Sequence, residues 1–438
     1  MLFRSTQKAG IKSDKWSVAA GWFDYDNDGK LDIFVVNYAK WTPAFNRFCG
    51  DLDRNIRVYC HPKYFEPMSN ALYHNRGDGT FEDVTDRSGI GKYVGRGMSV
   101  AFADYDGDGY MDIFVTNDNL PNFLFRNRGD GTFEEVALSA GVALTANGAP
   151  VASMGADFRD YNNDGLPDIN VTALAGETFP LFRNAGKGTF QDATYSSSIS
   201  RLTGRLSGWS NGFFDFNNDG WKDLFTANSH VDDRIELFEA TQYKLANSVF
   251  ANLGNGAFCD ASAESGEEFH VTRAHRGSAF ADFDGDGKID VVVSSLGESA
   301  ELWQNVSPAQ NHWLILKLIG TRSNRDGIGA RIRIGNQYSE MTTAVGYASS
   351  SDFGVHFGLG KAEKADTVEI RWPSGIVQVL KDVKADQVLD VREPERQWRS
   401  APAAVFLSPL RPIPSARPRH AVVPDTSSAL APPAPAGR

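Results

Sequence analysis

The sequence lacks the features that mark several large classes of protein. No run of about 18 apolar residues occurs, so no transmembrane helix is predicted. Positive charge is scarce: 44 Lys and Arg against 55 Asp and Glu give a net charge of −11, which argues against nucleic acid as a partner. The chain contains no H-E-x-x-H motif and no phosphate-binding loop, so these two catalytic signatures are absent.

Cysteine is also rare, with three residues in 438. Two interpretations remain open, because connectivity does not follow from sequence. Cys49 and Cys60 lie close together in a loop-like stretch and are placed to form a local disulfide, which leaves Cys259 over. Alternatively, all three are free thiols. The first residues show no basic n-region followed by an apolar h-region, so no secretory signal is predicted in this chain.

The chain is instead organised around a motif that occurs five times, D-x-[DN]-x-D-G-x-x-D, each followed by an apolar strand. The first copy runs from Asp24 to Asp32 and continues into Ile33-Phe34-Val35. The other copies span residues 104–112, 160–168, 215–223 and 282–290.

This spacing suits a hard divalent cation. Side chains at positions 1, 3 and 5 of a tight turn converge, Gly at position 6 permits a positive φ, position 7 offers its carbonyl, and Asp at position 9 closes an oxygen shell typical of Ca²⁺. We therefore predict up to five Ca²⁺ ions. The predicted ligand positions are Asp24, Asp26, Asp28, Lys30 and Asp32; Asp104, Asp106, Asp108, Tyr110 and Asp112; Asp160, Asn162, Asp164, Leu166 and Asp168; Asp215, Asn217, Asp219, Trp221 and Asp223; and Asp282, Asp284, Asp286, Lys288 and Asp290.

Two other interpretations of the motif are weaker. An Asp/Gly-rich turn that binds no ion needs only one or two of these residues, whereas five copies keep them all. An EF-hand requires Glu at position 12 and flanking helices. Position 12 is occupied here by Val35, Val115, Val171, Thr226 and Val293.

A second repeated element lies between the Asp motifs. Its first copy, residues 72–84, reads as strand, Asn/Gly turn and strand, which predicts a hairpin. First aspartates lie 80, 56, 55 and 67 residues apart, a period typical of propeller blades. The longest interval contains an insertion at about 41–69 and the 67-residue interval a smaller one at about 231–245.

The predicted fold class is all-β: a calcium-loop β-propeller of five countable blades (1–308), a small β-rich domain (309–395) and a disordered Pro/Ala/Arg-rich tail (396–438). Residues 2–11 and 301–305 look like two halves of one hairpin unit. They are predicted to complete a blade and close the ring; the alternative is a larger ring in a longer parent protein. Strands of the second domain are expected near 311–318, 330–334, 354–357, 367–372 and 377–380.

These motifs resemble the FG-GAP/VCBS repeat family, whose members are calcium-loop β-propellers like the head of integrin α chains. The second domain resembles the ASPIC/UnbV domain through Asn311-His312-Trp313-Leu314, Gly327-Ile328-Gly329-Ala330-Arg331 and Trp372-Pro373-Ser374-Gly375. Together they are similar to bacterial-type members of the cartilage acidic protein 1 family. Departures are the absent signal peptide, the absence of an EGF-like module after the second domain, and Asn at 162 and 217.

The resemblance implies a secreted, periplasmic or cell-surface protein that binds calcium. Our first hypothesis is a non-enzymatic binding or adhesion module for a protein or glycan ligand, with structural Ca²⁺ and no catalytic residue. The second is a calcium-dependent polysaccharide lyase or hydrolase, with His61, His230, His270, His275 or Asp352 as candidates. The third is a structural assembly component. Trp41, Trp209 and Trp221 serve either to stack on a ligand or to pack between blades.

Overall fold

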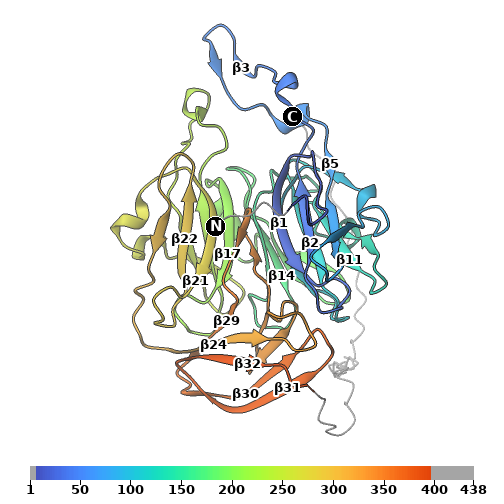
Figure 1. The fold of residues 1–438 in the computed structure, drawn as a ribbon. Helices are drawn as coiled ribbons and strands as arrows, with labels where there is room; N and C mark the ends of the chain where they lie inside the picture. The colour runs from blue at the N-terminus through green and yellow to red at the C-terminus, as the bar shows by residue number, and fades with distance from the viewer. Residues whose placement is uncertain (1–5, 396–438) are drawn as a thin grey trace, which may run out of the picture. The chain divides into compact units, whose positions relative to one another are not determined.

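The computed structural model describes residues 6–395, which lie within one compact unit ending at Gln397. The predicted all-β fold class is confirmed: the repeats form successive antiparallel sheets, and further sheets follow from residue 312 (Figure 1). Residues on both sides of the predicted boundary at 308 belong to that same unit. The predicted tail at 396–438 lies outside the described residues.

Each repeat forms one blade, a meander of up to four antiparallel strands in chain order. The strands are β1 (Ser17–Phe23), β2 (Asp32–Asn37), β6 (Ala71–Asn75) and β7 (Phe81–Asp83); β9 (Gly97–Ala103), β10 (Asp112–Asn117), β11 (Phe123–Asn127) and β12 (Phe133–Glu135); β13 (Ala156–Arg159), β14 (Asp168–Val171), β15 (Leu181–Asn184) and β16 (Phe190–Asp192); β17 (Gly208–Phe214), β18 (Asp223–Asn228), β19 (Ser248–Asn252) and β20 (Phe258–Asp260); and β21 (His275–Ala281), β22 (Asp290–Ser295) and β23 (Glu301–Trp303).

The first strand of each blade packs closely against that of the next, as the small residues before the Asp motifs predict. A Cβ on Gly21 of β1 would lie 2.3 Å from the Phe102 ring of β9, so only glycine fits there. Phe102 in turn stacks on Phe23 with ring centroids 4.5 Å apart. A similar stack joins Phe214 of β17 to Phe280 of β21 at 4.4 Å. Blade adjacency is therefore fixed by aromatic packing on the inner strands.

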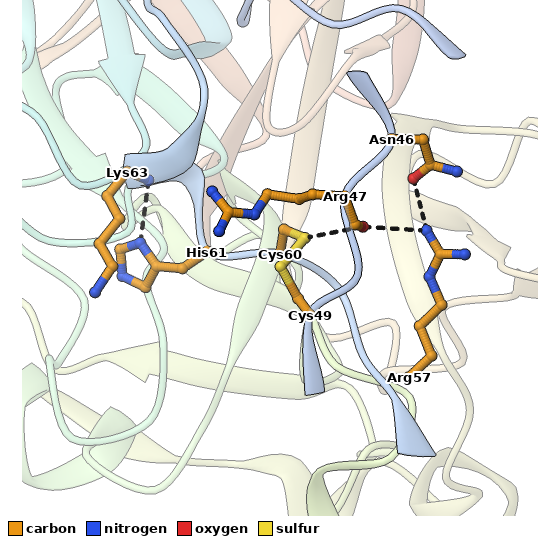
Figure 2. The surroundings of a disulfide bond; sticks show 7 residues. All are labelled: Asn46, Arg47, Cys49, Arg57, Cys60, His61 and Lys63. Carbon is orange, nitrogen blue, oxygen red and sulfur yellow. Dashed lines mark hydrogen bonds between the residues drawn. A yellow bond between two sulfur atoms is a disulfide. The ribbon is translucent and has the colours of Figure 1, made fainter. Parts of the chain in front are cut away.

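The insertion after β2 carries η1 (Pro43–Phe45), β3 (Gly50–Asp51), β4 (Ile56–Arg57), η2 (Pro62–Tyr64) and β5 (Met68–Ser69), and β5 pairs with β8 (Val94–Gly95). A disulfide joins Cys49 to Cys60, which selects one of the two sequence interpretations, and Cys259 is a free, half-buried thiol (Figure 2). Other connections contain short helices: η3 (Ile90–Lys92), α1 (Ala137–Ala140), α2 (Ile199–Thr203), η4 (Ile235–Leu237), η5 (Ser262–Glu264) and η6 (Glu267–His270). Among the described residues, no helix has the length and apolar character needed to cross a membrane.

The predicted ring closure is not found in the described residues. The fifth blade has three strands, and β23 pairs only with β22. The chain near the N-terminus lies against the first blade instead, where the Ala9 carbonyl accepts a hydrogen bond from Phe81 N (2.7 Å). Phe133 N makes the equivalent bond to Ser88 O (2.8 Å), so residues 6–11 occupy the place that a preceding blade's last segment takes elsewhere. The part of this prediction that rests on residues 2–5 lies outside the described residues.

The C-terminal part forms two sheets around one core. β24 (His312–Ile319) is flanked by antiparallel β29 (Gly354–Gly360) and parallel β32 (Gln387–Arg392), and the second sheet has the order β26 (Gln337–Glu340), β25 (Arg331–Ile334), β30 (Lys364–Arg371), β31 (Val377–Lys384) (Figure 1). All five strands expected from the sequence are present. β26 and β32 were not anticipated, because neither has a long apolar alternation.

A hairpin from the C-terminal part lies among the inner strands of the blades. It consists of β27 (Ala344–Val345) and β28 (Ser349–Ser350). Gly346 N donates to Ala156 O of β13 (2.8 Å), and Tyr347 N donates to Ser210 Oγ of β17 (3.1 Å). The Gly346 carbonyl accepts from Ser99 Oγ of β9. The hairpin therefore satisfies backbone groups that face the centre of the blade array.

We expect Gly346→Ala to lower the free energy of unfolding by about 2–4 kcal/mol. Gly346 has φ +60°, and an added Cβ would lie 2.0 Å from Ser210 Oγ. Gly375→Ala is the matched control, because Gly375 has φ +83° with no atom within 4 Å of a Cβ. The control bears only the left-handed strain of about 1–2 kcal/mol. Unfolding in guanidinium measures the free energy of unfolding of both variants. Equal losses in the two variants would show that the hairpin does not stabilise the blades.

Candidate metal-binding loops

All five Asp motifs form the connection between the first and second strands of a blade, and each turn is closed by its own first aspartate. In the first loop, Asp24 Oδ1 accepts from Asp28 N and Oδ2 from Gly29 N, both at 3.0 Å. The glycine at position 6 has the positive φ that the spacing predicts. The values are +86° for Gly29, +93° for Gly109, +86° for Gly165, +95° for Gly220 and +82° for Gly287.

The aspartate at position 9 is the buried anchor of each loop. In the second loop, Asp112 Oδ2 accepts from Tyr105 N (3.1 Å), while Oδ1 accepts from Asn127 N on the third strand (2.8 Å). Asp112 is fully buried. The same two bonds occur at the other position-9 aspartates, which are Asp32, Asp168, Asp223 and Asp290. Position 9 thus ties the loop to the third strand, and each oxygen keeps a lone pair free for a cation.

The asparagine that ends the third strand was not anticipated as a site residue. Asn127 Nδ2 donates to Met111 O in its own blade (3.2 Å) and to Tyr25 O in the preceding loop (2.7 Å). Three later asparagines make the same link to the preceding loop: Asn184, Asn252 and Asn305. Their recurrence at one place in every repeat was the available sequence signal. These amides couple each loop to the next.

Carboxylate oxygens converge in three of the five loops. Ligand atoms lie within 4.8 Å of one another in the sets Asp24-Asp26-Asp32, Asp104-Asp106-Asp108 and Asp282-Asp284-Asp290. The described residues contain no such acidic set in the loops starting at Asp160 and Asp215, because Asn162 and Asn217 replace a carboxylate at position 3. Three loops therefore hold a set of carboxylates suited to a hard cation, and two hold a weaker one.

A histidine joins the first loop. His74 Nδ1 lies 3.5 Å from Asp26 Oδ2 and 3.3 Å from Asp32 Oδ1, and Asp26, Asp28 and His74 form a further convergent set. His74 lies on the third strand and was missed, because nothing in the motif points to it. Asp26 Oδ1 is buried without a hydrogen-bond partner in the described residues, and so is Asp160 Oδ1. A cation would satisfy such oxygens.

The side chains at position 7 pack outward, so only their carbonyls are available as ligands. Tyr110 and Trp221 lie against the outer-turn glycines Gly129 and Gly254, and their rings would come within 2.8 and 2.9 Å of a Cβ added to those glycines. Lys30 packs in the same way and also pairs with Asp28 Oδ2. Trp221 is therefore a packing residue rather than a stacking surface.

Burial and mutual repulsion disfavour the ionised form of the loop carboxylates. Burial, opposed by backbone hydrogen bonds and reinforced by neighbouring aspartates, raises the pKa of Asp24 to about 6 and that of Asp32 to about 8. The same causes raise the pKa of Asp104 to about 6 and of Asp215 to about 7. A divalent cation bound at these oxygens would offset this repulsion.

Contacts link all five loops to the C-terminal part. Asp104 N donates to Glu340 Oε2 (3.0 Å), Arg331 donates to Gly165 O, and Lys222 Nζ donates to both Asp160 O and Tyr338 O (each 2.9 Å). The remaining loops are met in the same way: the Arg322 carbonyl lies against Gly29, Gly360 N donates to Asn218 O, and His356 Nε2 lies 3.3 Å from Gly287 O. The five loops therefore form the surface that the C-terminal part contacts.

Of the five residues considered for catalysis, two line one cavity and three lie elsewhere. His61 and His230 line a large cavity, where each ring Nδ1 accepts a local backbone N–H, from Lys63 for His61 (Figure 2) and from Asp232 for His230. His275 is fully buried against Glu301 (2.8 Å). His270 ends η6, and Asp352 accepts from Gly354 N (3.2 Å). Each occupies a turn or packing role.

Comparisons with known proteins agree with this architecture. The model of the FG-GAP-like repeat matches residues 58–115, 104–171, 160–226 and 231–293, and the ASPIC and UnbV model matches 320–397. Cartilage acidic protein 1 of Xenopus tropicalis is 28% identical over 388 residues, covering 85% of this chain and 54% of that protein. The Homo sapiens protein of that name is 27% identical over 416 residues, covering 89% and 57%. The chain thus spans about half the length of these curated relatives.

Among solved structures, an Agrocybe aegerita lectin that recognises non-reducing terminal N-acetylglucosamine aligns over 69% of this chain and 84% of its own. The sequence identity is 18% and the TM-score 0.35.

Proposed function

Because the chain belongs to the FG-GAP-like repeat family and carries an ASPIC and UnbV domain, we propose that it is a non-enzymatic, calcium-binding protein of the cell exterior that binds a protein or glycan. The observation that carries the calcium proposal is the convergence of aspartate oxygens in loops that repeat along the chain. Extracellular calcium is abundant enough to fill sites of modest affinity.

The metal would have a structural role. In each loop, bound Ca²⁺ would neutralise carboxylates that otherwise repel one another. The loop backbone also forms the surface on which the C-terminal sheets rest, through contacts such as Asp104 N to Glu340. Loading the loops would therefore stabilise both the turn within each blade and the contact between the repeats and the C-terminal part.

Metal content tests this proposal. We expect Asp286→Ala, at position 5 of the fifth loop, to lower the bound calcium by about one ion per chain, since that loop loses a ligand from its six-to-eight oxygen shell. Elemental analysis after equilibrium dialysis measures the ratio. Asp130→Ala is the matched control, because Asp130 is an exposed turn aspartate outside the loops whose Oδ1 accepts from Thr132 N (3.0 Å). If Asp286→Ala leaves the calcium count unchanged, the fifth loop is not a site; if the unmodified protein holds no calcium, the proposal fails.

A further inference from the structure

The described residues enclose a large cavity at the strand ends opposite the Asp loops. Its wall comes from segments just before the first strand or just after the second strand of the blades, including Trp16, Tyr38, Asp118 and Leu174, together with the two insertions. The cavity has a volume of about 1260 Å³. Sites for a single drug-sized molecule are about 300–1,000 Å³, so this cavity has room for a ligand of several linked units.

Part of the wall is contributed by the hairpin that lies among the inner strands. Tyr347, at its turn, meets Trp209 edge-to-face with ring centroids 4.9 Å apart. Both residues line the cavity, Trp209 almost fully buried and Tyr347 half-buried. The cavity is therefore complete only when the C-terminal hairpin is in place, and the C-terminal part contributes to a site formed mainly by the blades.

Three partly exposed aromatic side chains lie on the cavity wall. Trp16 is 45% exposed, Trp41 40% and Tyr59 58%, and the rings of Trp16 and Trp41 lie 5.8 Å apart. Such rings present a negative π face to solvent. The C–H face of a pyranose carries slight positive charge, and several adjacent rings suit successive sugar units. Polar groups beside them include Asn119 and the carboxylate of Asp118, which accepts from Tyr38 Oη (2.7 Å).

The arginines of the cavity have no acidic partners. Within residues 6–395, no carboxylate lies within 4 Å of the guanidinium of any of the four arginines on its wall, although the chain carries a net charge of −11. These are Arg47, Arg57, Arg234 and Arg276. The wall also carries four carboxylates, those of Asp118, Glu177, Asp232 and Asp233, so the arginines are local cationic groups and not part of a uniformly positive surface. Arg47, Arg57 and Arg234 are exposed, whereas Arg276 is half-buried. A half-buried cation without a counter-ion favours an anionic ligand, because the ligand supplies the missing charge.

Arg276 is the best positioned of the four. Its guanidinium lies 4.1 Å above the Trp209 ring, and its Nη1 donates to Ser229 Oγ and to His275 O (2.8 Å). The Tyr243 side chain also lies beside this guanidinium, with its ring centroid 5.9 Å away, and the remaining N–H groups of Arg276 are the donors available to a ligand oxygen. Arg57 is held less deeply, with Nη2 donating to Asn46 Oδ1 (2.6 Å) and Arg47 O (3.3 Å) beside the disulfide (Figure 2).

We propose that this cavity binds an acidic oligosaccharide, with sugar rings stacked on Trp16 and Trp41 and a carboxylate or sulfate group bound by Arg276. This deepens the proposed binding function by naming the ligand class. The cavity and the calcium loops lie at opposite ends of the strands, so the two proposals are tested separately.

Titration calorimetry in calcium buffer tests the ligand class with size-matched probes: a galacturonate hexamer, a sulfated chondroitin hexasaccharide, the neutral cellohexaose and a hexaglutamate peptide. We expect at least one acidic oligosaccharide to bind about tenfold or more tightly than cellohexaose and hexaglutamate. The first two probes distinguish carboxylate from sulfate. Equal affinity for cellohexaose overturns the role of the anion, equal affinity for hexaglutamate overturns the saccharide class, and no binding by either acidic oligosaccharide overturns the site.

Matched variants place the ligand. Trp16→Ala is expected to weaken binding about tenfold or more, whereas Trp22→Ala, which removes an equally exposed tryptophan (46%) outside the cavity, is expected to leave affinity unchanged. Arg276→Gln is expected to lose the preference for the acidic sugar and Arg276→Lys to retain part of it. Equal losses in both tryptophan variants would overturn the location. If the purified protein holds calcium but binds no acidic oligosaccharide, the oligosaccharide proposal alone fails. If the purified protein, never treated with a chelator, holds no calcium and still binds the oligosaccharide, the calcium proposal alone fails.

Discussion

Removal of calcium with EGTA will lower the melting temperature of the protein by roughly 10 °C or more. A ligand at about 100 times its dissociation constant contributes about 2.7 kcal/mol per site, and three loops have convergent carboxylates. Without the ion these carboxylates repel one another, and the loops carry the contacts to the C-terminal sheets, such as Lys222 Nζ to Tyr338 O. Differential scanning calorimetry in millimolar calcium and in EGTA measures the shift.

Two controls separate a metal effect from an effect of the chelator. EGTA that has been saturated with calcium should leave the melt unchanged. The Asp286→Ala variant should show a smaller shift than the unmodified protein, because one site no longer contributes. A melting temperature that does not respond to EGTA would contradict structural calcium at these loops.

Asp112→Ala will lower the free energy of unfolding by about 3–5 kcal/mol even in EGTA. Asp112 is fully buried and accepts hydrogen bonds from two backbone N–H groups, those of Tyr105 and Asn127. Alanine leaves both without an acceptor, at about 1–3 kcal/mol each, and leaves a small void as well. Urea unfolding monitored by tryptophan fluorescence measures the loss.

The comparison variant is Asp108→Ala in the same loop. Asp108 is exposed and, within the described residues, accepts only from Tyr110 N (2.9 Å), so the free energy lost in EGTA should stay below about 1 kcal/mol. In calcium both variants should lose a ligand. If the two substitutions cost the same in EGTA, position 9 would be a metal ligand alone and not the anchor of the blade.

Much of the geometry of the Asp loops was predictable because it is local. The turn that Asp24 closes on Gly29, and the positive φ at every position-6 glycine, involve residues within one nine-residue motif. His74 and the asparagines at the ends of the third strands were missed, since they reach the loops from other strands. The recurrence of the asparagines in the repeats could have identified them, whereas no sequence signal pointed to His74.

Other expectations depended on long-range packing and had a different outcome. The hairpin unit expected from 2–11 and 301–305 is not formed in the described residues, because the N-terminal chain bonds to Phe81 and β23 ends its sheet. Trp41 and Trp209 line one cavity, but Trp41 is exposed and Trp209 is buried beneath Arg276. The sequence left stacking on a ligand and packing between blades as alternatives for both.

By itself, the sequence determined that the chain is built of β repeats and where each acidic turn falls, because alternation and a nine-residue motif are short-range properties. Only the tertiary structure decided that the loops support the C-terminal sheets and that Tyr347 reaches a cavity beside Trp209. Those contacts join residues more than one hundred positions apart, and side-chain shape and backbone hydrogen bonding in the folded chain select them.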